Sequence, residues 1–322
     1  MPIHLVYKPL GITSHDAVAR ARRLLGTRRV GHAGTLDPLA TGVLVLLSEE
    51  ATKLSPFMSA SRKSYLAWVA FGLGTPTLDA EAPADDGDLT WGDAAGLTRE
   101  RVVEAASAFL EVREQRPPAY SAIKQAGQRS YAAARRGEAL EPPARAVAYF
   151  KVDLLGFAPR RADLPTTFAP SASGWAAAPD VSGHTFELPP ELTQLPCALF
   201  RLEVAAGTYV RSFARDLGAL LATPAHLAGL VRVAAGAIDL TRCSPLEEIA
   251  TAPRLDPVTA IDLPKVELDS KVAVAVRQGK QVGLAISGTT LLLDEDGKVA
   301  AVVEPAGERM RYLRVWQRGL TP

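Results

Sequence analysis

The stretch from Gly31 to Gly42 constrains the fold most, because it combines three glycines, one proline and a single carboxylate within GHAGTLDPLATG. The glycines at 31, 34 and 42 allow the backbone to turn sharply and to approach a ligand closely. Pro38 confines the preceding residue, Asp37, to extended geometry. The stretch therefore predicts a carboxylate held on a stiff, exposed turn.

Two familiar phosphate-binding loops are excluded by this stretch. No Gly-Lys-Ser/Thr follows the glycines, as it would in a Walker-type cradle, and the spacing is not the GxGxxG of a dinucleotide site. Asp-Pro beside glycine is also common in ordinary turns. The residue types alone leave both an ordinary turn and a functional loop open.

The residues before this loop predict a strand and a helix. Residues 5–26 begin with an apolar strand and turn at Lys8-Pro9. A helix then follows, capped at Thr13 or Ser14 and ended by Gly26.

Later segments predict alternating strands and helices. Residues 64–73 read as a strand, and the acidic, glycine-containing residues 79–98 read as a surface loop before a helix at 99–112. Residues 200–221 predict a strand, a tight glycine turn and a second helix. These segments therefore predict a chain with both strands and helices.

At 322 residues the chain exceeds the length at which a single core usually stops growing. We expect a large domain over 1–250, a proline-containing linker over 251–265 and a small domain over 266–322. Short strands with Gly and Asp-Gly turns in the last segment predict a small β-barrel. Residues 158–196, dense in Pro, Ala, Ser and Thr, predict a flexible insertion.

Basic residues are segregated, although the net charge is only +1. One acid-free stretch holds Arg20, Arg22, Arg23, Arg28 and Arg29, and a second basic stretch holds Arg113, Arg116, Lys124, Arg129, Arg135 and Arg136. Either stretch by itself is typical of a solvated helix face. Because the two flank the glycine loop, together they favour an RNA partner.

Several classes of protein are not expected. No apolar run approaches the roughly 20 residues of a membrane helix, and the N-terminus lacks a signal-peptide core, so we expect a cytoplasmic protein without membrane contact. The two cysteines, Cys197 and Cys243, are far apart, and the five histidines show no ligand spacing. We therefore expect no metal.

The segment GHAGTLDPLATGVL resembles the signature of the TruB-type tRNA pseudouridine synthases. Further blocks occur in that family's order over residues 5 to about 235: Tyr7-Lys8-Pro9 with Gly11, Glu50-Ala51-Thr52-Lys53, Lys63-Ser64-Tyr65, PAYSAIK ending at Lys124, GTYVR ending at Arg211, and His226-Leu227 with Leu230-Val231-Arg232. The chain departs from the pattern at Glu49, where a glycine is usual, and in the long segment 158–196.

The resemblance implies conversion of uridine to pseudouridine at position 55 in the T-loop of tRNA. It also implies an α+β fold, in which a mixed-sheet pseudouridine-synthase domain is followed by a PUA-like RNA-binding barrel. Asp37 would be the catalytic carboxylate, and Arg211 would pair with it. His32 would fill the space left by the flipped uridine. The other implied residues are Tyr65 stacking on the base, Tyr209 and Leu230 lining the pocket, and Lys8, Lys53 and Lys124 binding RNA or supporting the loop.

The chemistry suits a single carboxylate. The reaction breaks the bond from uracil N1 to ribose C1′ and joins C5 to C1′, with nothing oxidised or hydrolysed, so we expect no cofactor. The carboxylate either attacks C1′ or removes a ribose proton to give a glycal. Burial would raise the pKa of such a group, and a bidentate contact from Arg211 would oppose that shift.

Two other functions remain open. One is a guide-RNA-dependent pseudouridine synthase acting on ribosomal RNA, although the chain has no Lys-rich tail. The other is a non-catalytic protein that binds or folds tRNA. We expect a monomer that contacts the T-arm of tRNA.

Overall fold

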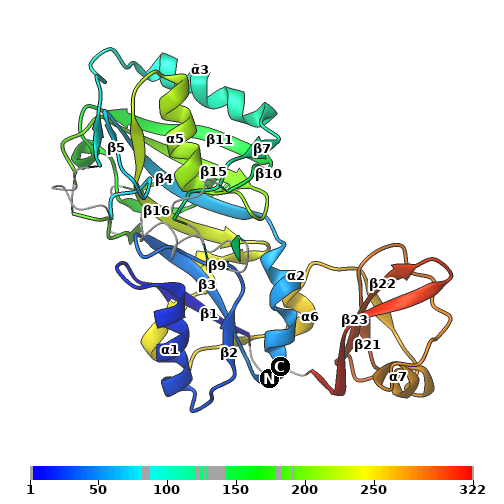
Figure 1. The fold of residues 1–322 in the computed structure, drawn as a ribbon. Helices are drawn as coiled ribbons and strands as arrows, with labels where there is room; N and C mark the ends of the chain where they lie inside the picture. The colour runs from blue at the N-terminus through cyan, green and yellow to red at the C-terminus, as the bar shows by residue number, and fades with distance from the viewer. Residues whose placement is uncertain are drawn as a thin grey trace.

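A computed structural model describes residues 3–81, 88–120, 124–125, 128–129, 142–178, 183–190 and 192–320, with the backbone alone at 124–125 and 128–129. The described chain forms a large mixed sheet with helices and a smaller C-terminal unit of strands and one helix (Figure 1). The predicted α+β class with a mixed sheet is confirmed.

The large sheet has ten strands within the described residues. Its main path runs in the order β11 (Tyr149–Ala158), β15 (Cys197–Val204), β4 (Lys63–Phe71), β16 (Ala225–Ala235), β3 (Ala40–Ser48), β1 (Ile3–Lys8) and β18 (Ser244–Pro245). Off this path, β17 (Ile238–Asp239) pairs with β16, β19 (Arg254–Leu255) with β1, and β2 (Val30–His32) with β3. The β3–β16 and β1–β18 pairs are parallel, and the other described pairs are antiparallel.

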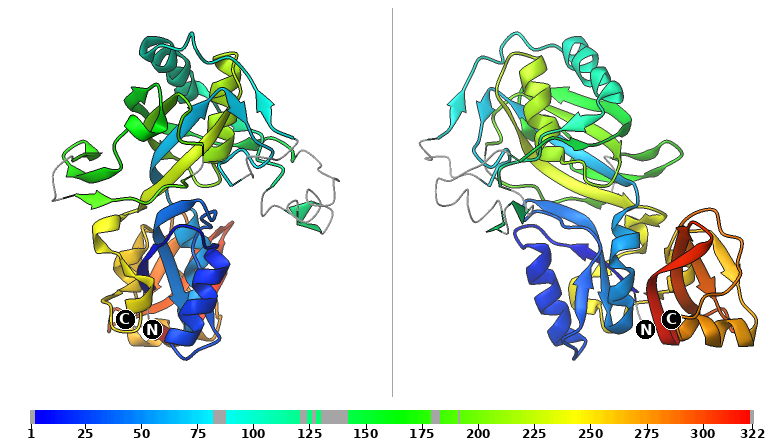
Figure 2. Two further views of the ribbon diagram at one scale, coloured as in Figure 1. Left: turned by 90° about the vertical axis from the view of Figure 1, so that its left-hand side faces the viewer. Right: turned by 45° about the vertical axis from the view of Figure 1, so that its right-hand side comes forward.

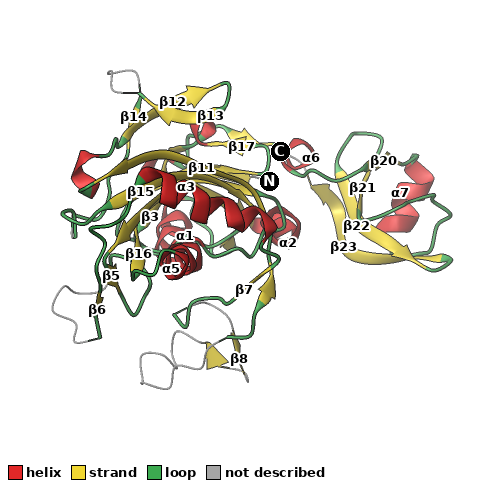
Figure 3. Ribbon diagram, turned by 90° about the horizontal axis from the view of Figure 1, so that it is seen from above, coloured by secondary structure: helices red, strands yellow, loops and turns green. Residues whose placement is uncertain are grey.

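The described α-helices are α1 (Ser14–Leu24), α2 (Ser55–Ser59), α3 (Arg99–Ser107), α5 (Val210–Leu220), α6 (Pro257–Ala260) and α7 (Ser270–Arg277). Seen from above, α1, α3 and α5 lie on one face of the large sheet (Figure 3). The predicted limits of α1 are confirmed. Thr13 caps its first turn in a capping box with Asp16, and Gly26 follows it with a φ of 65°.

The central strands are apolar because both of their faces are covered. All nine residues of β3 are buried. Val43 and Val45 point to the hydrophobic cluster on one face of the sheet, and Leu44 and Leu46 point to the cluster on the other, next to α1 and α5. Because side chains alternate along a strand, an apolar run of this kind requires cover on both sides.

Residues 158–196, expected to be a flexible insertion, contain strands in their described part. In its described part the segment forms an antiparallel sheet of β12 (Thr167–Ser171), β13 (Gly174–Ala177) and β14 (His184–Thr185). Phe168, Trp175 and Phe186 are buried in one cluster with Trp68 of β4, on the face of the large sheet opposite α5 (Figure 3). The three aromatic side chains show no regular spacing in this Pro- and Ala-rich segment, so the sequence does not indicate strands. Their burial in the cluster stabilises the small sheet.

The predicted linker, 251–265, packs against the large sheet. Strand β19 within it pairs with β1, and Leu255 and Ile261 are buried in the same cluster as Ile3. Its composition resembles that of a linker, but its few apolar residues dock on the large sheet.

The C-terminal unit is a four-stranded sheet ordered β20 (Lys265–Glu267), β21 (Thr290–Leu293), β22 (Val299–Ala306) and β23 (Arg309–Leu320). Helix α7 lies in the segment for which the sequence predicts mainly short strands. The side chain of Asp269 accepts a hydrogen bond from the backbone of Val272 and starts the helix. The unit lies beside α2 and α6 in Figures 1 and 2, and Trp316 donates a 3.0 Å hydrogen bond to the carbonyl of Glu50.

Three two-stranded sheets complete the described strands. They are β5 (Leu73–Gly74) with β6 (Thr90–Trp91), β7 (Glu114–Gln115) with β10 (Arg145–Ala146), and β8 (Lys124–Gln125) with β9 (Gln128–Arg129). No helix in the described part of the chain is long and apolar enough to cross a membrane.

Glu49, where the resemblance leads us to expect glycine, keeps a backbone conformation that favours glycine. Its φ is 50°, and its N–H donates to the carbonyl of Arg29 at 2.8 Å. Its side chain accepts a hydrogen bond from Thr27 and lies 3.7 Å from Arg29. The departure from the family pattern therefore leaves a left-handed turn in place.

Candidate active site

Asp37 lies at the edge of a cavity of about 290 Å³ between its own loop, β4, β16 and the start of α5. The side chain of Asp37 is 34% exposed, so a ligand in the cavity can reach the carboxylate. The residues around the cavity are Gly34, Thr35, Leu36, Asp37, Ser59, Lys63, Tyr65, Ala205, Gly207, Thr208, Tyr209, Val210, Arg211, Leu230 and Arg232.

The side chains of Ser14 and Lys8 form hydrogen bonds that hold the loop carrying Asp37. The hydroxyl of Ser14 accepts a hydrogen bond from the backbone N–H of Leu36 at 2.8 Å. The ammonium of Lys8 donates to the carbonyl of Ile12 at 2.6 Å and reaches that of Pro38 at 3.5 Å. Lys8 is buried, which lowers the pKa of its side chain to about 8. Lys8 therefore supports the loop from inside the protein.

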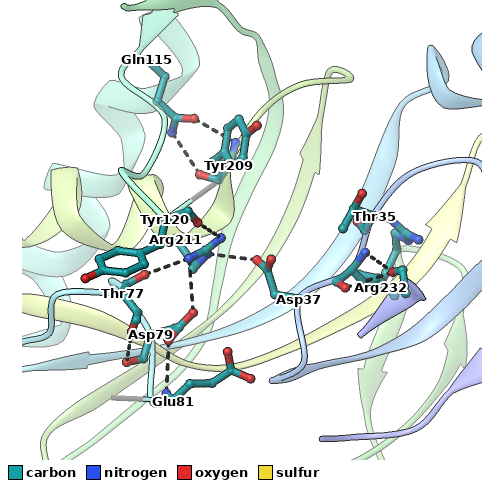
Figure 4. A network of polar contacts seen from close by, with 12 residues as sticks. Thr35, Asp37, Thr77, Asp79, Glu81, Gln115, Tyr120, Tyr209, Arg211 and Arg232 are labelled. Atoms are coloured by element: carbon teal, nitrogen blue, oxygen red, sulfur yellow. Dashed lines mark hydrogen bonds and ion pairs between the residues drawn. The ribbon is translucent and has the colours of Figure 1, made fainter. Parts of the chain in front are cut away.

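Arg232 holds the same loop from β16. Its guanidinium donates to the carbonyls of Gly34, Thr35 and Val43 at 3.1, 3.2 and 2.7 Å (Figure 4). Gly42 of β3 pairs with Arg232 of β16. Glycine allows this close pairing of the two strands, because a Cβ at Gly42 would lie 2.3 Å from the carbonyl oxygen of Arg232. Gly42 therefore serves strand packing rather than approach to a ligand.

Arg211 lies between two carboxylates. Its Nε is 2.9 Å from Oδ2 of Asp37, and one terminal nitrogen is 3.5 Å from Oδ2 of Asp79 (Figure 4). The side chain of Arg211 is 8% exposed, so both pairs are largely shielded from water. The pairing of Arg211 with Asp37 that the resemblance implies is present.

The expected bidentate contact is wrong, however. The two terminal nitrogens of Arg211 donate at 2.9 Å to the carbonyls of Thr77 and Tyr120, which leaves Nε alone for Asp37. That Nε does not reach hydrogen-bond alignment with any partner among the described residues. The contact with Asp37 is therefore an ion pair through a single nitrogen.

Asp79 was expected on an acidic surface loop, and its side chain is instead 1% exposed. Its carboxylate accepts hydrogen bonds from the hydroxyl of Thr77 at 2.6 Å and the backbone of Glu81 at 3.1 Å. Burial raises the pKa of Asp79, and the charge of Arg211 opposes that rise. No local pattern separates Asp79 from the acids that follow it, because its partner lies in a distant part of the chain.

The structure brings Tyr65, Tyr209 and Leu230 to the cavity, as expected. Tyr209 directly precedes α5, and Gln115 holds its backbone on both sides. The side-chain amide of Gln115 accepts from the N–H of Tyr209 at 2.9 Å and donates to its carbonyl at 3.1 Å (Figure 4). Nothing in the local sequence around Gln115 marks this role.

His32 does not line the cavity. It lies on β2 in edge-to-face contact with His15, with ring centroids 5.6 Å apart. Burial lowers the pKa of His32, so its ring is neutral at pH 7. Its expected role, to fill the space left by the flipped uridine, stays a prediction.

Two further lysines, Lys53 and Lys124, were expected to bind RNA or support the loop. The ammonium of Lys53 pairs with Glu50 at 2.6 Å and donates to the carbonyl of Val315 at 3.3 Å, so Lys53 joins the large domain to the C-terminal unit. The side chain of Lys124 lies outside the described residues.

The first basic stretch lies on and after α1, with Arg22, Arg23, Arg28 and Arg29 exposed. In the second stretch, the side chains of Arg129, Arg135 and Arg136 lie outside the described residues. The exposed part of the first stretch gives the surface a concentration of positive charge.

Lys63 belongs to the Lys63-Ser64-Tyr65 block, and the resemblance implies no separate role for it. Lys63 lines the cavity two residues before Tyr65, and its side chain is buried. No group of three or more potential metal ligands occurs in the part of the chain that the structure describes.

Comparison with known proteins gives consistent matches. Residues 22–170 match a family model described as TruB family pseudouridylate synthase (N terminal domain). The chain is 46% identical to tRNA pseudouridine synthase B of Deinococcus deserti over 316 residues, which covers 98% of this chain and 100% of that protein. It is 44% identical to the protein of the same name from Thermus thermophilus, covering 99% of each.

Solved structures share the fold at lower identity. A chain in a Cbf5-Nop10-Gar1 complex superimposes with a TM-score of 0.65 and 20% identity, covering 98% of this chain and 84% of that one. A chain of the archaeal box H/ACA sRNP Nop10-Cbf5 complex gives a TM-score of 0.61 at 18% identity, covering 98% and 85%.

Proposed function

Because the chain belongs to the TruB family of pseudouridylate synthases, isomerases of uridine in tRNA, we propose that it modifies uridine 55 in the T-loop and that Asp37 acts on the ribose. The observation that carries the role of Asp37 is its contact with the buried Arg211 at the edge of a cavity of nucleoside size. A charged partner that is fixed in place orients the carboxylate toward the cavity.

The cavity suits a single flipped nucleotide. Tyr65 and Leu230 offer flat and apolar surfaces for a uracil ring, and a nucleotide bound in this way would turn its ribose toward Asp37. The C1′–N1 bond breaks, the base turns within the cavity, and C5 bonds to C1′. The hydrogen of C5 leaves to water as a proton, and N1 takes up a proton in its place. His32, outside the cavity lining, is free to occupy the place that the base has left in the RNA.

Arg211 has a second use in this scheme. As Asp37 gains a bond to carbon or a proton, its negative charge falls, and Arg211 remains balanced by Asp79. The guanidinium therefore stays in place through either form of the reaction, attack on C1′ or removal of a ribose proton.

The C-terminal unit extends the proposed contact with RNA as a PUA-like domain. A groove between η1 (Glu49–Leu54) and this unit is lined by Lys53, Arg277 and Arg318. Lys53 is paired with Glu50 and Arg277 with Asp294, and Arg318 adds an exposed positive side chain that suits a phosphate backbone.

Release of tritium from uracil C5 tests the proposal. Wild-type protein should release the label from T-arm RNA that carries uridine at position 55, and a cytidine there should abolish release. Asp37→Asn should bind the RNA within a few-fold of wild type while releasing no label. Asp262→Asn, an exposed carboxylate outside the cavity lining, serves as the matched control and should keep full activity.

Two results would refute the scheme. Undiminished release by Asp37→Asn would remove Asp37 from the chemistry. Tight RNA binding without any release by the wild type would favour the non-catalytic alternative.

A further inference from the structure

Two buried cations beside Asp37 have no carboxylate partner among the described residues. Lys63 and Arg232 both line the cavity, and both are buried. Arg211, by contrast, is matched by Asp37 and Asp79. Burial of an unpaired cation costs free energy. The described part of the cavity therefore carries positive charge that an anionic ligand would balance.

Strand register places these cations next to the base-binding side chains. Tyr65 of β4 lies opposite Arg232 of β16, and residues two apart on a strand share a face. Lys63 therefore lies on the same face as Tyr65, and Arg232 on the same face as Leu230. One continuous face thus presents two side chains for a base beside two for an anion.

The ammonium of Lys63 has donor capacity left. It donates to the carbonyls of Ser59 and Ser61, the latter at 2.5 Å, and its third N–H has no partner among the described residues. Burial and the neighbouring Arg232 lower the pKa of Lys63 to about 8. That value is above neutral, so the side chain is still mostly charged at pH 7.

We propose that Lys63, backed by Arg232, binds a backbone phosphate that flanks the target uridine. This inference rests on the proposed function. A nucleotide that places its base against Tyr65 and its ribose at Asp37 carries phosphates directly bonded to that ribose, and Lys63 lies on the same face. An ammonium serves a phosphate as a point charge and needs no planar geometry.

Neutral linkages in the RNA provide the direct test. T-arm RNAs would carry one methylphosphonate on the 5′ or the 3′ side of the target uridine, each compared with a phosphodiester RNA of identical 2′-deoxy substitution. For wild-type protein, we expect one of the two neutral linkages to raise Kd about tenfold. For Lys63→Met, the same linkage should change Kd less than about twofold, because the interaction is already lost.

Arg62→Met is the matched control. Arg62 precedes Lys63, is exposed and lies over the ring of Phe150, so its loss removes a neighbouring charge outside the cavity lining. This variant should keep the full sensitivity to the neutral linkage. If Lys63 served only to hold the turn at Ser59 and Ser61, Lys63→Met would weaken all RNAs equally and keep the sensitivity of wild type. That outcome would overturn the inference.

The two proposals fail separately. Wild-type protein that releases tritium but binds both neutral linkages as tightly as phosphodiester RNA would overturn the phosphate site and leave the isomerase proposal standing. Absence of tritium release would instead refute the proposed function. Should Lys63→Met not fold, as judged by thermal unfolding, Lys63→Gln takes its place, and the wild-type comparison decides the matter without any variant.

Discussion

Arg211 and Asp37 meet through one contact, Nε to Oδ2 at 2.9 Å, while both terminal nitrogens of the guanidinium are bonded to backbone carbonyls. The position of the guanidinium is therefore set by the segments that carry Thr77 and Tyr120, and not by Asp37. The carboxylate faces a cation that is already fixed in place before any substrate arrives.

Arg211→Lys tests whether kcat depends on the fixed position of this guanidinium. Lysine keeps the charge but cannot contact Asp37, Asp79 and two carbonyls together. We expect kcat to fall by about a hundredfold or more, roughly 2.7 kcal/mol of transition-state stabilisation, with KM changed by only a few-fold. Arg215→Lys, one turn further along α5 and paired with Asp216, should remain near wild type. Equal activity of the two variants would contradict the assigned geometry.

Gly42→Ala should be much more harmful than Gly207→Ala. Both glycines have positive φ, 101° and 85°, so both substitutions add backbone strain of roughly 1 kcal/mol. A Cβ at Gly42 would also collide with the backbone of Arg232, whereas a Cβ at Gly207 meets nothing within 4 Å. We expect the difference in the free energy of unfolding, measured with urea, to exceed about 2 kcal/mol. A difference near zero would show that β3 and β16 separate easily.

His4 should make the protein sensitive to mild acid. It is buried beside Ser48, and burial together with the charge of Arg254 lowers its pKa from 6.5 to about 4. Between these values the unfolded chain takes up a proton that the folded chain does not. Stability contributed by neutral His4 is therefore present above pH 6.5 and is lost as pH falls toward 4, by up to about 1.4 kcal/mol per pH unit.

His4→Gln isolates this contribution. Urea unfolding of both proteins at several values between pH 4 and 6.5 gives two slopes, and the slope of the variant should be smaller by about one proton. Parallel slopes would mean that His4 titrates normally in the folded protein.

Trp175→Ala tests whether the segment 158–196 is part of the core. The indole of Trp175 is 3% exposed and donates to a carboxylate oxygen of Asp239 at 3.1 Å. Its removal should lower the free energy of unfolding by roughly 3–5 kcal/mol. Trp91→Ala, at an indole that is 65% exposed, should cost less than about 0.5 kcal/mol. A small loss of unfolding free energy at both positions would support the expected flexible insertion.

Local sequence determined much of the element order and the turn that carries Asp37. Thr13 caps α1 through atoms three residues away, and Gly26 ends the helix through its own backbone freedom. The resemblance carried by GHAGTLDPLATGVL likewise led to Asp37 and, through a second block, to Arg211. These features could be predicted because capping, turn geometry and contiguous motifs act over a few residues.

Tertiary contacts decided the rest. Asp79 reads like the acids of a surface loop and becomes the second partner of Arg211 because folding buries it there. Lys63 and Arg232 lie far apart in the chain and share one cavity because β4 and β16 are adjacent. Trp175 reads as part of an irregular segment and is ordered by packing on the large sheet. Burial and the energy of charge pairs depend on residues distant in sequence, so no local pattern records them.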